Sequence, residues 1–207
     1  MLKAYFCRVA ADPPAVPEAF LSSYRKEKLA AKTAPRVRRE SVFSELLLRC
    51  ALRDSGFPLD GPLKIATGEH GKPFLKGNEV FFNLSHSADM LLCALSDSEV
   101  GADVQIRSEA KLPLLERFFA EDEREYVLSA KGSDDAFTEI WTEKESWIKR
   151  IGLGLALPLR SFSVLDESIA PLLAHRRAGE YHLSVCGEAV REGAIDWIEV
   201  NKDALLG

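Results

Sequence analysis

The sequence predicts an α+β fold with two similar subdomains, and three observations lead to this prediction. The expected elements come in blocks, with helices, then strands, then helices and finally strands, rather than in the β–α alternation of a doubly wound sheet. The chain has 207 residues, enough for one large domain or two small ones with their own cores. The parts before and after residues 97–100 have similar content, which predicts subdomains over residues 1–99 and 100–207.

The first half should begin with a strand, because apolar and polar residues alternate weakly there. Prolines then break the alternation, two helices follow, and the second of these ends at Gly56. That helix should bury Val42, Leu46 and Cys50. The expected elements are a strand over 2–9, helices over 18–32 and 36–55, a strand-and-loop region from Ile65, and strands over 80–86 and 90–95.

The second half should open with a strand after a turn around Asp97 and Ser98. Three helices follow without an intervening strand, and three strand-like segments close the chain. The expected elements are a strand over 100–105, helices near 112–119, 121–131 and 134–151, and strands over 161–165, 181–186 and 195–200.

The helix over 134–151 carries the most informative pattern. At about 100° per residue, one apolar arc holds Phe137, Ile140, Trp141, Trp147, Ile148 and Ile151. The opposite side, expected to be solvated, holds Glu139, Glu143 and Arg150. Lys144 falls in the middle of the apolar arc, where a lysine is costly unless it meets an anion. Either it extends past the tryptophans to water, or, with Glu145 and Lys149 on the arc's edge, it points into a cleft that holds a phosphate and its metal.

Composition excludes several classes of protein. The net charge is −5 and the pI is near 5.5, which argues against a nucleic-acid binder. No apolar run approaches the roughly 20 residues of a membrane span, and the first residues lack the apolar core of a signal peptide. We therefore expect a cytoplasmic protein that binds neither nucleic acid nor membrane.

Cysteines and cations point to buried thiols and to a local anion site. The four cysteines are scattered, and His182 and Cys186 share one face of a strand as packing residues, so a zinc site is disfavoured. Seven lysines and arginines nevertheless crowd residues 25–39, either as an ordinary solvated face or as a site for an anionic small molecule.

Two carboxylates stand out beside these cations. Asp103 lies on an expected strand and Glu145 on the helix, a pair that suits Mg²⁺ bound to substrate phosphates. Alone the signal is weak, because Asp103 also fits a strand-end aspartate and Glu145 an i,i+4 partner of Lys149. The sequence Ser85-His86-Ser87 ends a strand, but a serine hydrolase would need an orienting acid and an oxyanion hole, so we disfavour that class.

Five motifs together resemble a known family. They are Gly71-Lys-Pro73, Phe82-Asn-Leu-Ser-His-Ser87, Val100-Gly-Ala-Asp103, Phe118-Phe-Ala-Glu-Asp-Glu123 and Trp141-Thr-Glu-Lys-Glu-Ser-Trp-Ile-Lys149, continued by residues 152–164. In this order and spacing they resemble the 4′-phosphopantetheinyl transferases of the Sfp type. The resemblance implies two α+β subdomains in a pseudo-twofold arrangement, with coenzyme A bound between them.

The resemblance also implies roles for individual residues. The metal ligands would be Asp103, Glu145 and Gln105, for Mg²⁺ with Mn²⁺ as an alternative. Glu145 would also be the general base, and Lys149 would contact the pyrophosphate. The coenzyme A contacts would include Lys72, Pro73, Ser85, His86, Lys149 and Arg39, with Lys144 contributing positive charge to the cleft. Glu123 matches a further acidic position at the site.

Two positions depart from the family pattern. Gln105 stands where the family usually has a glutamate, so it can offer an oxygen but no charge to the metal. Glu40 stands where the family has an arginine that reaches a coenzyme A phosphate, which leaves Arg39 or Arg38 for that contact.

The implied reaction is the attack of a serine hydroxyl of an apo acyl or peptidyl carrier protein on the β-phosphorus of coenzyme A, catalysed by a monomer. The carrier is expected to dock near Leu112, Leu114, Leu115 and residues 116–130, unless these leucines are ordinary core. Two alternatives stay open: a non-catalytic module that binds coenzyme A or a carrier, and another Mg²⁺-dependent enzyme that cleaves a pyrophosphate.

Overall fold

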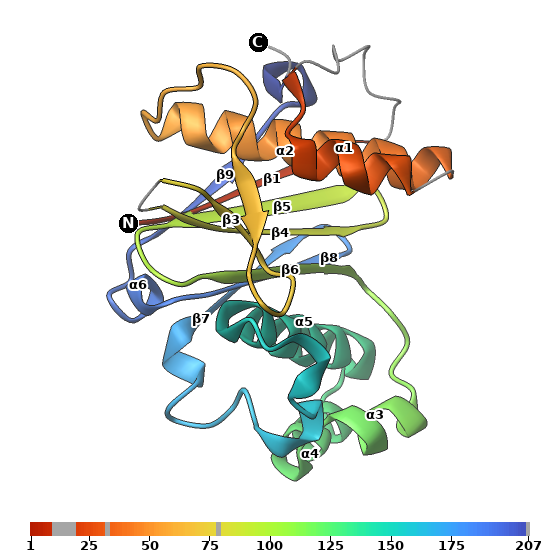
Figure 1. The fold of residues 1–207 in the computed structure, drawn as a ribbon. Coiled ribbons are helices and arrows are strands. Elements are labelled where there is room, and N and C mark those ends of the chain that lie inside the picture. Colours follow the sequence, from red (N-terminus) through yellow and green to blue (C-terminus); the bar gives the residue numbers. More distant parts are fainter. Residues whose placement is uncertain (10–19, 32–33, 78–79, 206–207) are drawn as a thin grey trace.

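The computed structural model describes residues 1–9, 20–31, 34–77 and 80–205 (Figure 1). In the first half, β1 spans Leu2–Arg8, α1 Ser23–Ala30, α2 Pro35–Asp54, β2 Ile65–Thr67, β3 Pro73–Leu75, β4 Phe81–Ser87 and β5 Met90–Ser96. In the second half, β6 spans Gly101–Ile106, α3 Leu112–Phe118, α4 Glu121–Ser129, α5 Ser133–Ile151, β7 Leu173–Ala178, β8 Tyr181–Cys186, α6 Glu188–Arg191 and β9 Ile195–Glu199.

The elements form four layers, and this arrangement confirms the α+β prediction (Figure 1). A four-stranded sheet with the order β4-β5-β1-β9 lies against α1 and α2, and a three-stranded sheet with the order β6-β8-β7 lies against α5. The two sheets face each other in the middle, and α3 and α4 lie beyond α5. Each half therefore contributes a sheet with a long helix on its outer face.

The last strand crosses back to the first half. β9 runs parallel to β1, with Leu2 opposite Ile195, whereas β1 and β4 both run antiparallel to β5. The chain thus ends in the sheet in which it begins. The division into subdomains over 1–99 and 100–207 stays a prediction.

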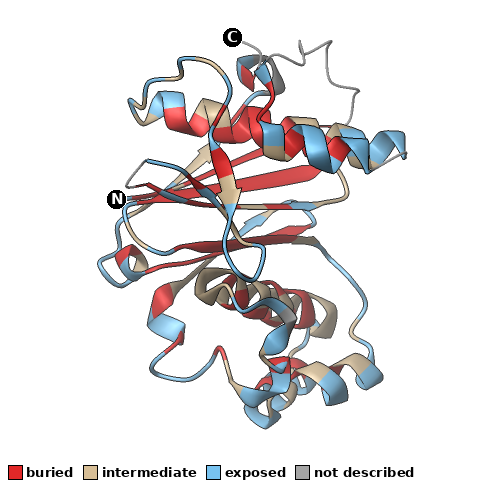
Figure 2. Ribbon diagram, viewed as in Figure 1, coloured by how far each residue is buried: buried red, intermediate tan, exposed pale blue. Residues whose placement is uncertain are grey.

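Three apolar clusters stabilise the fold, one under α2, one between the two sheets and one between α5 and the pair α3 and α4, and they include many of the buried strands and helix faces in Figure 2. Leu47 of α2 packs against Leu91 of β5 in the first cluster, and Phe6 packs with Val104 and Leu183 between the sheets. In the third cluster the rings of Phe119, Phe137 and Trp141 stack, with 5.2 Å between the centroids of the two phenylalanines. Full burial of one such side chain stabilises the fold by about 1.5–3 kcal/mol.

Helix α5 is covered on two sides, which corrects one expectation. Its apolar arc packs into a core as predicted, in a cluster shared with α3 and α4, but the side expected to be solvated lies on the three-stranded sheet. There the hydroxyls of Ser146 and Ser184 are 2.9 Å apart, and burial raises the pKa of Glu143 to about 8. A side-chain carbon at Gly101 would stand 1.9 Å from the carbonyl oxygen of Ser146, so this glycine lets α5 lie directly on β6.

Most expected elements are present, with differences at the edges. Leu46 is buried as predicted, whereas Val42 and Cys50 are partly buried. The helix expected over 18–32 begins at Ser23 in the described part of the chain, while residues 18, 19 and 32 lie outside it. The strand expected over 161–165 is wrong, since this segment forms turns, and strands β3 and β7 were not expected. None of the helices within the described residues is long and apolar enough to cross a membrane.

Candidate active site

A cleft of about 320 Å³ opens between the turn that joins β2 to β3, strand β4 and the C-terminal half of α5. It is lined by His70, Gly71, Lys72, Pro73, Asn83, Leu84, Glu145, Ile148, Lys149, Gly152 and Gly154. Four of the residues expected at the site, Lys72, Pro73, Glu145 and Lys149, therefore share one cleft although they lie far apart in the sequence.

Helix α5 supplies the charged groups of the cleft. Glu145 and Lys149 are four residues apart and therefore lie on the same side of the helix. Burial raises the pKa of Glu145, the charge of Asp103 raises it further, and the Lys149 ammonium opposes both. The helix ends at Gly152, whose φ of 73° is a left-handed conformation that glycine adopts without strain. The chain then turns so that Gly152 and Gly154 also line the cleft.

Asp103 of β6 contacts both Lys149 of α5, which lines the cleft, and Ser85 of β4. Its side chain is almost fully buried, and its Oδ1 lies 2.5 Å from Nζ of Lys149. The hydroxyl of Ser85 also donates to Oδ1, at 2.7 Å, while Nε2 of Gln105 donates to Oδ2, at 2.8 Å. The structure thus brings Asp103, Gln105, Ser85 and Lys149 together, and the charge of Asp103 is one of the causes that raise the pKa of Glu145.

This donor set fits a hard divalent cation. Two carboxylates and an amide oxygen are the ligand types that Mg²⁺ takes, and Mg²⁺ leaves several positions to water and substrate phosphates. Burial and the charge of Asp103 both raise the pKa of Glu145, and a bound cation would offset this repulsion. No group of three or more His, Cys, Asp or Glu side chains suited to a metal occurs in the described part of the chain.

Lys72 and Pro73 lie in the turn between the short strands β2 and β3. The Lys72 ammonium donates to Glu99 at 2.6 Å and to the carbonyl oxygens of Val100 and Arg150 at 3.1 and 2.9 Å. It therefore binds the C-terminal carbonyl end of α5, where a cation is favourable. Lys72 thus lines the cleft, but its ammonium group binds the end of α5, a contact that the sequence did not predict.

His86 and the residues near position 40 lie on the other side of β4. Nδ1 of His86 is 3.6 Å from Oε2 of the buried Glu40, whose other oxygen, Oε1, accepts from Nε of Arg36 at 2.7 Å. Arg39 is partly buried on α2, and neither it nor His86 lines the cleft. The structure therefore separates these two expected coenzyme A contacts from the Glu145–Lys149 pair.

Lys144 corrects the expectation that it points into the cleft. Its side chain is fully buried and donates to both oxygens of Glu123, at 2.7 and 2.6 Å, and to the carbonyl oxygen of Phe162 at 2.7 Å. These contacts take all three of its donors. Neither alternative holds, because the lysine reaches neither water nor the cleft, and Glu123 is its partner rather than an acidic group of the site.

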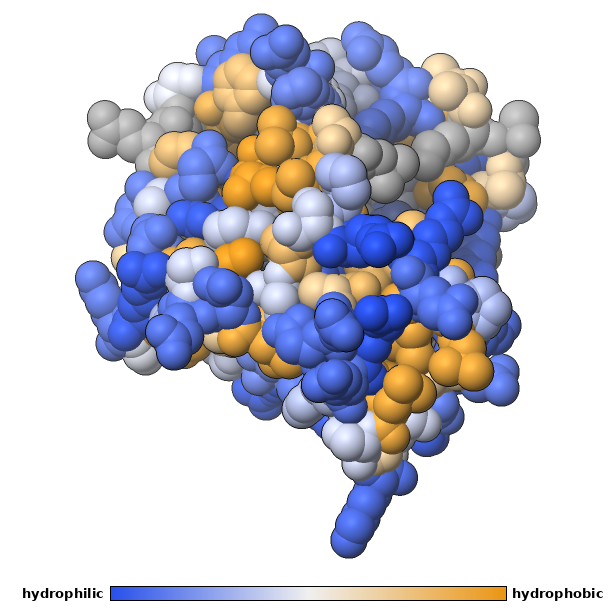
Figure 3. Space-filling model, turned by 90° about the horizontal axis from the view of Figure 1, so that it is seen from below, coloured by the Kyte–Doolittle hydropathy of each residue, from blue (hydrophilic) through white to orange (hydrophobic). Residues whose placement is uncertain are grey.

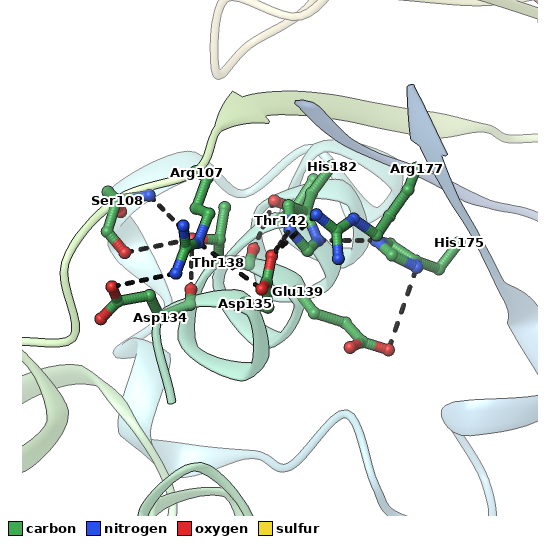
Figure 4. A network of polar contacts seen from close by, with 10 residues as sticks. All are labelled: Arg107, Ser108, Asp134, Asp135, Thr138, Glu139, Thr142, His175, Arg177 and His182. Atoms are coloured by element: carbon green, nitrogen blue, oxygen red, sulfur yellow. Dashed lines mark hydrogen bonds and ion pairs between the residues drawn. The ribbon is translucent and has the colours of Figure 1, made fainter. Parts of the chain in front are cut away.

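A second polar network surrounds the first turns of α5 (Figure 4). The rings of His175 and His182 are joined by a 3.0 Å contact, and Nε2 of His182 lies 3.2 Å from Asp135, which also pairs with Arg177. Burial is the main cause that lowers the pKa of both imidazoles, for His175 to about 4. As expected, His182 packs on its strand, where its side chain is buried.

Comparison with known proteins places the chain in a family. A sequence model of the 4′-phosphopantetheinyl transferase superfamily matches residues 99–195. The 4′-phosphopantetheinyl transferase gsp of Aneurinibacillus migulanus is 39% identical over 59% of this chain and 52% of its own length. For Sfp of Bacillus subtilis these values are 33%, 70% and 66%, and for a Synechocystis protein named "Putative 4′-phosphopantetheinyl transferase" they are 31%, 77% and 68%. The chain belongs to the 4′-phosphopantetheinyl transferase superfamily.

The match covers only part of the transferases. The chain spans about half to two thirds of the length of the curated relatives that it matches. The matched residues 99–195 include β6, α5 and β8, and thus the carboxylates and the lysine of the cleft. Of the two positions that depart from the family pattern, Gln105 lies within the matched segment and Glu40 precedes it.

Proposed function

We propose that this transferase-family chain moves the 4′-phosphopantetheine arm of coenzyme A to a serine of an apo acyl or peptidyl carrier protein and releases adenosine 3′,5′-bisphosphate. The observation that carries the proposal is that Glu145 and Lys149 line one cleft, and that Lys149 pairs with the buried Asp103, in a chain of this family. All of these groups come from a single chain, so we propose that a monomer is active.

Magnesium, or manganese in its place, would be held by Asp103, Glu145 and the amide oxygen of Gln105. When bound, the ion would supply Lewis-acid stabilisation of the pyrophosphate. Gln105 contributes no charge, so we expect weaker metal binding than a third carboxylate would give.

The residues of the chain have complementary tasks in the transfer. The oxygen of the carrier serine bonds to the β-phosphorus as the bond from that phosphorus to the bridging oxygen breaks, and adenosine bisphosphate carries that oxygen away. Glu145 accepts the proton of the serine hydroxyl, a step that typically contributes about 10²–10⁴-fold. Lys149 adds positive charge beside the phosphates, where positioning and charge neutralisation are the main demands of phosphoryl transfer.

We propose one surface for coenzyme A and another for the carrier. The turn at Lys72 and Pro73 would lie beside the nucleotide, and we keep His86 and Arg39 as contacts for its phosphates. For the carrier, Leu112 is 59% exposed, whereas Leu115 is buried core, which excludes that leucine as a docking residue. The end of the molecule formed by α3 and α4 shows apolar patches within a largely hydrophilic surface (Figure 3). We propose this end as the carrier surface.

Intact-protein mass spectrometry tests the proposal. The full chain is incubated with coenzyme A, Mg²⁺ and apo carriers of the fatty-acid, polyketide and peptide types. We expect one carrier to gain the mass of phosphopantetheine, and to gain none with EDTA. Glu145→Gln should abolish most of the transfer while it still binds coenzyme A, and the exposed Glu167→Gln serves as the matched control.

The same experiment decides against the proposal if no carrier is modified although coenzyme A binds measurably. That result would favour a non-catalytic binding module, the alternative to which Gln105 and Glu40 point. Free phosphopantetheine without carrier modification would instead indicate an enzyme that cleaves the pyrophosphate by hydrolysis.

A further inference from the structure

The two sheets meet along β4 and β6, which belong to different sheets. Three side chains of β4 accept hydrogen bonds from the backbone of β6 across this seam. The N–H of Ala102 donates to Asn83 at 2.9 Å, that of Val104 to Ser85 at 3.3 Å, and that of Ile106 to Ser87 at 3.1 Å. The seam therefore resembles a β-ladder in which side-chain oxygens of β4 accept the hydrogen bonds that backbone carbonyl oxygens would accept in a sheet. Each of these three hydrogen bonds is one rung of the ladder.

Alternation along the strand explains this ladder. Successive side chains of a strand point to opposite faces, so positions 83, 85 and 87 share one face. Phe82 on the other face belongs to the cluster under α2. An edge strand has backbone N–H groups that need partners once they are buried. The motif Asn83-Leu-Ser-His-Ser87 thus supplies one acceptor to every second residue of β6.

The middle rung differs from the other two because its hydroxyl also contacts two charged side chains, Asp103 and Lys149. The Ser85 hydroxyl donates to Oδ1 of Asp103 at 2.7 Å and accepts from Nζ of Lys149 at 3.1 Å, in addition to the N–H of Val104. A hydroxyl has one donor and two acceptor positions, and all three are used. The side chain is buried, with 7% exposure, so water does not compete for them. A direct contact of this hydroxyl with coenzyme A would require one of the three bonds to break.

We propose that Ser85 is a positioning residue that fixes the Asp103 carboxylate, and with it the Lys149 ammonium, for the metal and the pyrophosphate. Ser85 holds one oxygen of Asp103 and Gln105 holds the other, so the carboxylate has contacts from both strands of the seam. This inference rests on the proposed transferase function. It assigns Ser85 to the assembly of the site between the halves rather than to the binding of coenzyme A.

Three variants separate this role from simple support of the seam. Ser85→Ala removes the middle rung and its bond to Asp103. Ser87→Ala removes the neighbouring rung, in which the hydroxyl accepts from the N–H of Ile106, and is the matched control. Ser85→Thr keeps the hydroxyl and suits a strand.

Two readouts that do not depend on turnover are measured in each variant. Amide hydrogen exchange of the metal-free protein should accelerate at Val104 in Ser85→Ala and at Ile106 in Ser87→Ala. Calorimetric titration of Mg²⁺ in the presence of coenzyme A should show a midpoint raised about 10–100-fold in Ser85→Ala, as for other groups that orient metal ligands. Ser87→Ala and Ser85→Thr should stay near the wild-type midpoint. Carrier modification is then followed by mass spectrometry.

Equal Mg²⁺ midpoints in Ser85→Ala and Ser87→Ala would overturn the positioning role, as would a folded Ser85→Thr that is as impaired as Ser85→Ala. A wild-type protein that binds Mg²⁺ with coenzyme A but modifies no carrier overturns the transferase function alone, since the midpoints still decide the role of Ser85. A wild-type protein that binds no Mg²⁺ overturns both.

Discussion

The buried ion pair between Lys144 and Glu123 should be among the most sensitive points of the fold. Both side chains are fully buried, and the ammonium lies 4.2 Å from the centre of the Phe162 ring. The Glu123 carboxylate also accepts from the backbone N–H groups of Ala120 and Val164, both at 2.8 Å. The pair therefore joins α5, the start of α4 and the segment after α5 at one point.

Lys144→Met should leave the Glu123 carboxylate buried without its cation. The removal of one partner from a buried pair typically costs about 3–5 kcal/mol. For a chain of this size, that loss lowers the midpoint of thermal unfolding by about 6–20 °C. The exposed pair of Lys3 and Asp54 gives a matched control, because Lys3→Met should cost at most about 1 kcal/mol.

The double variant Lys144→Met/Glu123→Gln shows whether charge is the cause. Without the carboxylate no unpaired charge remains, so the double variant should regain a part of the loss, with a coupling of about 1–3 kcal/mol between the two positions. Chemical denaturation at pH 7 measures the wild type, Lys144→Met, Glu123→Gln, the double variant and the control Lys3→Met. A loss in Lys144→Met no larger than in Lys3→Met, or losses that simply add in the double variant, would refute the reasoning.

Three further predictions concern packing and pH. Gly101→Ala should destabilise the protein by about 1–3 kcal/mol or more, because its side-chain carbon would clash with α5, whereas Gly132→Ala, with its nearest contact at 3.6 Å, should not. His175 has a lowered pKa near 4, so the unfolded state binds more protons between about pH 6.5 and 4. Unfolding free energy should fall as the pH falls through that window, and His175→Gln should lose less stability between pH 7 and pH 5. Glu143 should affect the pH dependence of stability in the opposite direction. Its pKa is raised to about 8, so the folded state keeps a proton that the unfolded state loses, and the free energy of unfolding falls as the pH rises through about 4.5–8. In urea titrations, the free energy of unfolding of Glu143→Gln should therefore increase relative to that of the wild type between pH 5 and pH 9.

Local patterns in the sequence predicted much of this fold and of its cleft. The aromatic arc of α5 and most strands follow from periodicity alone, which records what each element buries. Glu145 and Lys149 share a side because four residues make about one helical turn. The sequence also proposed Asp103 as their partner, and the structure brings its carboxylate to Lys149.

Tertiary contacts explain what the patterns missed. The segment from Ser161 to Leu165 alternates like a strand, but the carbonyl of Phe162 and the N–H of Val164 bind the Lys144–Glu123 pair instead. β7 was not expected because it contains two exposed arginines and lies at the edge of its sheet. The second buried side of α5 was missed because small hydroxyl residues, rather than apolar ones, face the sheet. The contacts Lys144–Glu123 and Ser146–Ser184 join residues that are 21 and 38 positions apart in the sequence.

The arrangement of α5 gives a physical meaning to the triplet Lys144-Glu145-Ser146. Lys144 and Ser146 are both fully buried, one against α4 and the other against β8. Neighbouring residues on a helix are about 100° apart, so these two contacts on opposite flanks fix the rotation of the helix about its axis. A rotation by one residue would bury Glu145 and break both contacts. The outer residues of the triplet thus hold the glutamate between them toward the cleft, which is why a lysine that never reaches the cleft belongs to the same motif as the residue that lines it.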